Sequence, residues 1–257
     1  MGFFKDLVSK KGCELCGKEV GALSREKLKD GLFICSDCRN NCSKFFSLTL
    51  YTLEDVKKHI EYMKLQEELY NKEFVTLPDD KKITTVKLFP HEGITFADDL
   101  AMFEVVISKN KEQRIKELFR YDDIYDFRVY TKNAPEGSNK KYSEVGIEIR
   151  FMLDVPNLMD YHTYHYIHKY VKTLQIPLER NVDSLDVNNL AYKHMKVITG
   201  CTIESNVGSF DKSKEIKYDY RNIEELKRDF DKTNYTKIAD EVERRVWGKT
   251  ASEMFDN

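Results

Sequence analysis

The sequence predicts an α+β protein that begins with a small ribbon built around four cysteines. Two Cys-x2-Cys pairs stand within the first 38 residues, the segment 53–74 has apolar residues at helical spacing, and several segments of 83–153 alternate as strands do. A linking helix, a small antiparallel β domain and a helical C-terminal region follow from these patterns. The expected units are a ribbon at 1–46, a helical linker at 47–80, a β-rich α+β domain at 81–200 and a helical extension at 201–257.

The ribbon is predicted from the spacing of Cys13, Cys16, Cys35 and Cys38. Two Cys-x2-Cys pairs with 18 residues between them are typical of a tetrahedral Zn²⁺ site with four thiolate ligands. Because cysteine occupies every ligand position, we expect one structural Zn²⁺ with no position open for water or substrate. A disulfide framework and unrelated buried thiols are the alternatives, and six cysteines in 257 residues disfavour the first.

Local turn residues support the ribbon. Lys29-Asp30-Gly31 is typical of a tight turn between Arg25–Lys29 and Leu32–Cys35, which predicts a hairpin. Ser36 is expected to cap a short helix that carries Cys38. The other two cysteines, Cys42 and Cys201, are expected to be buried thiols.

Apolar residues at Val56, Ile60, Met63 and Leu69 predict an amphipathic helix over 53–74, which Pro78-Asp79-Asp80 ends. The predicted strands are Ile83–Phe89, Met102–Ser108, Leu118–Arg120, Ile124–Thr131 and Val145–Leu153. The predicted later helices, the first two separated by Pro177, are Tyr161–Leu174, Val187–Ile198, Ile223–Phe230 and Tyr235–Trp247. We expect the last two to form a two-helix cap on the sheet domain, and a docking surface for a partner is the alternative use.

Three segments carry a family resemblance: the lead Met1-Gly2-Phe3, the run Cys13–Gly21 and the run Lys27–Cys38, which passes through Lys-Leu-Lys-Asp-Gly. In them the chain resembles a small bacterial and phage zinc-ribbon family of unknown function. Phe119–Phe127 is similar to a strand–turn–strand in the second part of that family. The resemblance implies a ribbon followed by a small pleckstrin-homology-like β domain, a binding or adaptor role, and zinc ligation by the four cysteines. It brings no catalytic residues.

The chain departs from this family in two places. Asn133–Lys141 stands where related proteins often carry a glycine-rich stretch, and the segment from Asp160 onward is longer and richer in Tyr and His. The resemblance therefore does not extend to the C-terminal third.

Two other clusters are candidate sites. His162, His165 and His168 share a helical face, and two of them could bind a metal with Asp160 or Asp154; a solvated Tyr-rich face is the simpler interpretation. A metal-dependent nuclease needs carboxylates that converge at a strand end. The candidates are Asp98-Asp99, Asp122-Asp123 and Glu148, although alternating charge on an exposed strand face explains Glu148 more simply.

Composition limits the function classes. The chain has 42 Lys and Arg against 44 Asp and Glu, a net charge of −2, so its overall charge does not favour nucleic acid or anionic membranes. The absence of a long apolar run or a leader-like start leads us to expect a cytoplasmic protein.

The leading hypothesis is a non-enzymatic zinc-ribbon adaptor that binds another protein in a phage–host or stress-related setting. The alternative is a nucleic-acid-binding protein or metal-dependent nuclease that uses the ribbon as a grip. Residues 1–44 contain nine Lys or Arg against six Asp or Glu, and Asp122, Asp123 or Glu148 would supply the metal carboxylates.

Overall fold

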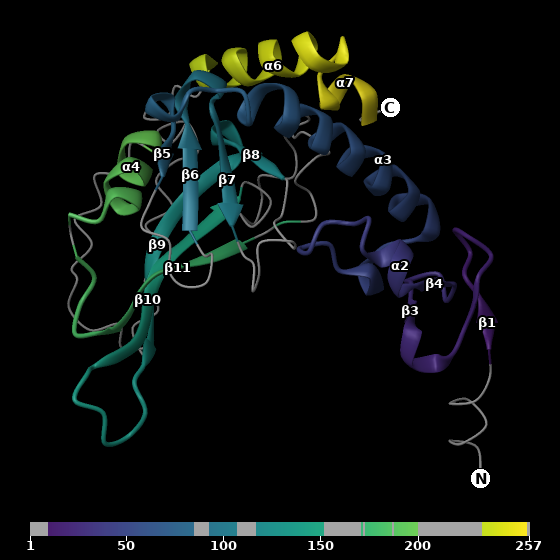
Figure 1. Cartoon of the computed structure of the whole chain (residues 1–257), viewed down its shortest axis with the longest axis horizontal. Coiled ribbons are helices and arrows are strands. Elements are labelled where there is room, and N and C mark those ends of the chain that lie inside the picture. The colour runs from purple at the N-terminus through teal and green to yellow at the C-terminus, as the bar shows by residue number, and fades with distance from the viewer. Residues whose placement is uncertain are drawn as a thin grey trace, which may run out of the picture.

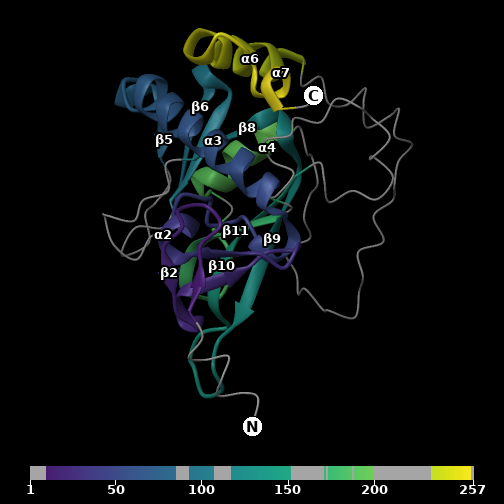
Figure 2. The same cartoon turned by 90° about the vertical axis from the view of Figure 1, so that its right-hand side faces the viewer.

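A module at the N-terminal end, a long helix and a two-sheet body follow one another along the chain (Figure 1). This computed structural model describes residues 10–84, 93–106, 117–151, 171, 173–186, 188–199 and 233–255. Helix α3 leads from the module to the body, and α6 and α7 lie at the same end of the body as α3 (Figure 2).

The N-terminal module, residues 10–52, is called the cysteine module below. Its elements are β1 (Lys11–Gly12), β2 (Glu19–Val20), β3 (Arg25–Lys27), β4 (Phe33–Cys35) and α2 (Ser36–Arg39). The predicted hairpin is confirmed, since β3 pairs with β4 and Gly31 has the positive φ of 84° that its turn requires. The predicted cap of α2 is wrong, because the N-cap is Cys35, whose sulfur accepts the N–H of Cys38.

The predicted linking helix is confirmed as α3 (Leu53–Leu69), continued by a π-helical turn over Tyr70–Phe74. Thr52 and Asp55 form a capping box that satisfies amide groups at its start. The buried face of α3 consists of Val56, His59, Tyr62, Gln66 and Leu69. His59 and Gln66 are polar, so the buried face of α3 includes positions that the spacing of its apolar residues does not indicate.

The body contains two antiparallel sheets, with strand orders β5-β6-β7-β8 and β11-β10-β9. Their strands are β5 (Ile83–Thr84), β6 (Gly93–Ala97), β7 (Met102–Val106), β8 (Leu118–Arg120), β9 (Ile124–Asn133), β10 (Tyr142–Phe151) and β11 (Thr173–Val182). One hydrophobic core contains side chains of both sheets, and the rings of Phe119 and Phe151, 5.6 Å apart, join the two. The described fold is therefore mixed helix and sheet with an N-terminal cysteine cluster.

Strand β11 overturns part of a helix prediction. Thr173 and Leu174, assigned above to a helix, pair instead with β10, and Pro177 lies inside the strand rather than between helices. Proline is tolerated there because β11 is at the edge of its sheet and the register shifts beside Pro177. Of the rest of the predicted helix, Val171 is described and is not helical, and 161–170 and 172 lie outside the described residues.

Helices α4 (Leu190–Thr199) and α6 (Thr233–Trp247) confirm two predicted helices, and α7 (Ala251–Phe255) follows α6. Ala239 and Val242 of α6 are buried in the same core as the sheets. The guanidinium of Arg245 binds both carboxylate oxygens of Glu73, which ties α6 to the end of α3. The other helix of the predicted cap, Ile223–Phe230, lies outside the described residues.

Candidate metal centre

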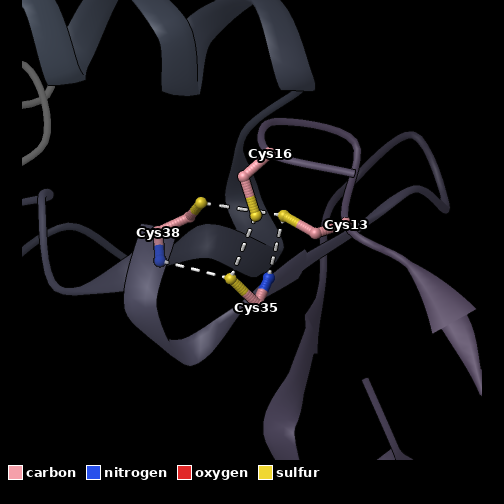
Figure 3. Close-up of side chains that lie close together, drawn as sticks. All are labelled: Cys13, Cys16, Cys35 and Cys38. Carbon is pink, nitrogen blue, oxygen red and sulfur yellow. Dashed lines mark hydrogen bonds between the residues drawn. The ribbon is translucent and has the colours of Figure 1, made fainter. Parts of the chain in front are cut away.

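The four predicted cysteines converge on one point (Figure 3). Cys13 and Cys16 come from the turn between β1 and β2, Cys35 ends β4, and Cys38 lies on α2. Their four sulfurs all lie within 4.8 Å of one another. Segments 19 to 25 residues apart in sequence are thus brought together by the hairpin and the short helix that follows it.

Two of the distances between the sulfurs match the separation that a tetrahedral ion requires. The Sγ atoms of Cys13 and Cys38 are 3.7 Å apart, and so are those of Cys16 and Cys35. A tetrahedral ion with bonds of about 2.3 Å to sulfur separates its ligands by about 3.8 Å. The cluster can therefore hold a metal ion at its centre. Cys16 is exposed at its surface, whereas the other three are buried.

Backbone amides point at the sulfurs, as they do where thiolates are stabilised. The N–H of Cys35 lies 3.3 Å from the sulfur of Cys13, and the N–H of Cys38 lies 3.4 Å from that of Cys35. Burial opposes ionisation of Cys13, but the amides of Cys35, Cys16 and Leu15 outweigh it and lower the pKa of this thiol to about 6. Burial, followed by the neighbouring sulfurs, raises the pKa of Cys38. A metal cation bound among the sulfurs would cancel the effect of the neighbouring sulfurs on the pKa of Cys38.

Hydrogen bonds fix the cysteine module to the rest of the chain. Arg39 donates from its guanidinium to the carbonyls of Ser43, at 2.9 Å, and Phe46, at 3.0 Å, and so secures the chain after α2. Ser43 then donates its N–H to Nε2 of His59 at 3.0 Å and its hydroxyl to Glu117 at 2.7 Å. Ser43 thus connects the module to both α3 and the body. These residues carry no sequence motif, so sequence reasoning missed them.

The other predicted thiol and metal candidates do not join the cluster. Cys42 is buried, as predicted, and burial raises the pKa of its thiol to about 11. Cys201, the candidate ligands His162, His165 and His168, and the carboxylates Asp154 and Asp160 lie outside the described residues. Within the described residues, the four cysteines are the only group of three or more Cys, His, Asp or Glu side chains close enough to share an ion.

The predicted acidic candidates are engaged in structural pairs instead. Asp122 accepts hydrogen bonds on both oxygens from Arg120. Asp98 accepts from the Tyr121 hydroxyl and contacts His194, each at 2.8 Å. These carboxylates and Asp123 do not gather with Glu148 into a metal-binding group in the described part of the chain.

Glu148 is buried rather than exposed, which corrects the simpler interpretation given above. Only 5% of its surface is accessible, and its carboxylate accepts hydrogen bonds from Arg128 of β9 and from Gln175 of β11. The strand register places these two side chains directly opposite Glu148. Glu148 thus links the three strands of its sheet.

Arg120 is a buried centre that sequence reasoning did not identify. It is 1% exposed and binds Asp240 and Glu243 of α6 as well as Asp122. Its two α6 partners lie 120 and 123 residues away in the sequence. No local pattern could have indicated this pairing.

Comparison with known protein families matches residues 11–59 to a domain of unknown function, DUF4428. The match covers the four-cysteine cluster and the first part of α3. Comparison with curated proteins and with solved structures found no match in either set. In the described residues, no helix combines the length and apolar character that crossing a membrane requires.

Proposed function

We propose that this chain is a non-enzymatic adaptor, in which one structural Zn²⁺ stabilises a ribbon that binds another protein. The observation that supports this most directly is the cluster itself, four sulfurs with separations of 3.7 Å in two pairs. Four thiolates complete a tetrahedral shell, so the ion would serve the fold of the module and not a reaction. The same chemistry suits a reducing compartment such as the cytoplasm, where thiols persist.

The attachment of the cysteine module to the rest of the chain supports a role in which the module offers its surface to a binding partner. Ser43 joins it to His59 and Glu117 through buried hydrogen bonds, so the module has a defined position at the N-terminal end of α3 (Figure 1). Its outer surface carries exposed side chains, among them Leu23, which is 91% exposed. A rigidly held module with an exposed outer surface suits recognition by a partner.

The body fits a pleckstrin-homology-like domain, which we include in the proposal. A four-stranded and a three-stranded antiparallel sheet share one core and are followed by α4, whose Met195 and Ile198 are buried in that core. Such a domain would act as a second binding module.

The proposal is tested by metal analysis combined with affinity capture. We expect one Zn²⁺ per intact chain and none in the Cys13→Ser/Cys16→Ser variant. A protein captured from lysate by the intact chain should bind again when purified, and should not bind the variant. Lys57→Glu, a change on the exposed side of α3, is the control and should leave metal content and capture unchanged.

Two outcomes would contradict the proposal. Full metal content in the double cysteine variant would show that Cys13 and Cys16 do not bind the Zn²⁺. Recovery of only nuclease-sensitive material, released as the salt concentration rises, would favour the nucleic-acid class instead.

A further inference from the structure

One face of the β3–β4 hairpin, which also carries the buried Cys35 opposite Arg25, gathers cations around one aromatic ring. Residues directly opposite each other in an antiparallel pair share a face, so Lys27 and Phe33 lie together, and Arg25 lies on that face two residues away. Glu26 and Ile34 occupy the other face, where Ile34 is fully buried and Glu26 lies near Arg39. Positive and negative side chains of this hairpin are thus segregated.

Two of these cations are held against the ring. The ammonium of Lys11, from β1, lies 4.4 Å from the ring centroid of Phe33, and the guanidinium carbon of Arg25 lies 5.0 Å from it. Cation–π contact orders both side chains, and it leaves the positive charge of the exposed Lys11 available to a partner. We call Lys11, Arg25, Lys27 and Phe33 the cationic face.

The lysines of the cationic face are available to an incoming anion. Lys11 and Lys27 are both exposed, and neither forms an ion pair within the described residues. Lys18, by contrast, is already bound to Asp37 at 2.7 Å. A ligand with negative charge would therefore gain interactions at the cationic face without displacing an internal carboxylate from either lysine.

An acidic polypeptide fits this face better than a nucleic acid does. Single-stranded nucleic acids bind through bases stacked on aromatic rings along an extended basic groove. Here the one ring of the face, Phe33, already carries Lys11 and Arg25, and the face extends over short strands only. Leu23, two residues before Arg25 and 91% exposed, adds an aliphatic contact that suits a peptide side chain.

We propose that the cationic face binds an acidic polypeptide segment of the partner, with Leu23 contacting an apolar side chain next to the acidic residues. This inference rests on the proposed adaptor function and names its binding surface and the chemistry of its ligand. Complementary charge would speed the encounter and set its orientation, and Leu23 would add desolvated contact area.

The test uses the zinc-loaded full chain and fluorescein-labelled Gly-Ser peptides of twelve residues that carry increasing numbers of glutamates, each with or without one leucine. Fluorescence anisotropy should show affinity that rises with glutamate number and falls with added salt. Lys11→Glu/Lys27→Glu should weaken binding by roughly tenfold or more, since it replaces attraction with repulsion at two positions. Leu23→Ser should weaken binding only of the peptides that contain leucine.

The matched control is Lys57→Glu/Lys64→Glu, which makes the same change in charge at exposed positions of α3 and should alter affinity less than about twofold. Unchanged circular dichroism and zinc content would establish that each variant keeps its fold.

Three results would overturn the inference. Equal loss of affinity in the two double variants, or no binding of any peptide, would show that the cationic face is not the binding surface. The adaptor function would still be tested separately by the capture experiment. Tighter binding of labelled oligothymidine than of the most acidic peptide would overturn both proposals.

Discussion

His59 lies where the cysteine module meets α3, and it is 2% exposed. Its Nε2 accepts the N–H of Ser43, and its ring stacks on Phe46 with centroids 4.0 Å apart. Burial, with a smaller effect from the charge of Arg39, lowers the pKa of His59 to about 3. The imidazole is therefore neutral in the folded protein, and it joins the two parts of the chain as a hydrogen-bond acceptor.

This lowered pKa predicts a loss of stability in mild acid. Between about pH 6.5 and pH 3 the unfolded chain binds a proton at His59 that the folded chain does not, so the stabilisation is present above pH 6.5 and declines below it. The decline should approach about 1.4 kcal/mol per pH unit. Denaturant unfolding of wild type and His59→Gln from pH 7.5 to pH 5 measures it, since Gln keeps an acceptor that does not titrate. Parallel profiles for the two proteins would contradict the assignment.

Tyr62 presents the opposite case, a buried polar group without a partner. It is 1% exposed, and within the described residues its hydroxyl is the only buried side-chain polar atom that forms no hydrogen bond. Burial and the nearby carboxylates of Glu117 and Glu243 raise the pKa of Tyr62, so the hydroxyl stays neutral. Its desolvation is an uncompensated cost to the fold.

We predict that Tyr62→Phe leaves the free energy of unfolding unchanged or raises it by up to about 1 kcal/mol, because it removes that cost. Tyr70→Phe is the matched control, since the Tyr70 hydroxyl donates to the buried Glu104 at 2.9 Å. That control should lose about 1–3 kcal/mol. Equal destabilisation of both variants in urea would show that the Tyr62 hydroxyl does have a partner.

Strand β10 is the central strand of its sheet, and it contains a close approach of backbones at Gly146. A Cβ atom there would lie 2.3 Å from the carbonyl oxygen of Ile176 and 2.6 Å from the ring of Tyr130. The register of β10 and β11 shifts at this point. Glycine is thus required by packing at the irregularity that also accommodates Pro177.

We predict that Gly146→Ala destabilises the protein by about 1–3 kcal/mol through overpacking. Gly21→Ala is the control, because Gly21 has φ of −72° and no atom within 4 Å of the added methyl group. That change should stay within about 0.5 kcal/mol. Thermal unfolding of both variants provides the comparison, and equal midpoints would argue against the close approach.

At the scale of the whole molecule, α3 joins the two largest hydrophobic cores of the described residues, and a third, smaller one is formed by Tyr62 and Ala251. The core of the cysteine module contains Val20, Leu28 and Ile34 and reaches α3 at Val56, whereas the larger core includes both sheets, α4 and α6. A core as small as the first usually needs a metal or a disulfide to fold. Arg120 and its partners Asp240 and Glu243 bind α6 to the larger unit independently of the cysteines.

Metal removal should therefore unfold one part of the molecule and spare the other. With a chelator, we expect amide hydrogen exchange to accelerate strongly in β3 and β4 and to stay slow in β9 and β10. Structural zinc contributes about 10–16 kcal/mol in small finger peptides, enough to decide the fold of such a module. Excess Zn²⁺ added with the chelator is the control. Simultaneous loss of protection in β10 would mean that the two cores unfold as one unit.

Local patterns were sufficient for the cysteine cluster and for most described elements. The spacing of Cys13, Cys16, Cys35 and Cys38, with a Gly31 turn between the pairs, predicted a cluster that the structure brings together. Helix α3, the strands β9 and β10 and helix α6 were also predictable. In each of them, the spacing of apolar residues along the segment itself shows which side chains are buried. The edge strand β11 was not, since Pro177 resembles a break until its neighbour in the sheet is known.

Only the tertiary structure decided the roles of the polar residues. Glu148 appeared to be an exposed or metal-binding carboxylate, and the folded chain instead places it between Arg128 and Gln175. His59 joins Ser43 across 16 residues, and Arg120 joins Glu243 across 123. The physical reason is that a charged or polar side chain is stabilised in the interior by a specific partner, and the identity of that partner depends on which distant segments meet.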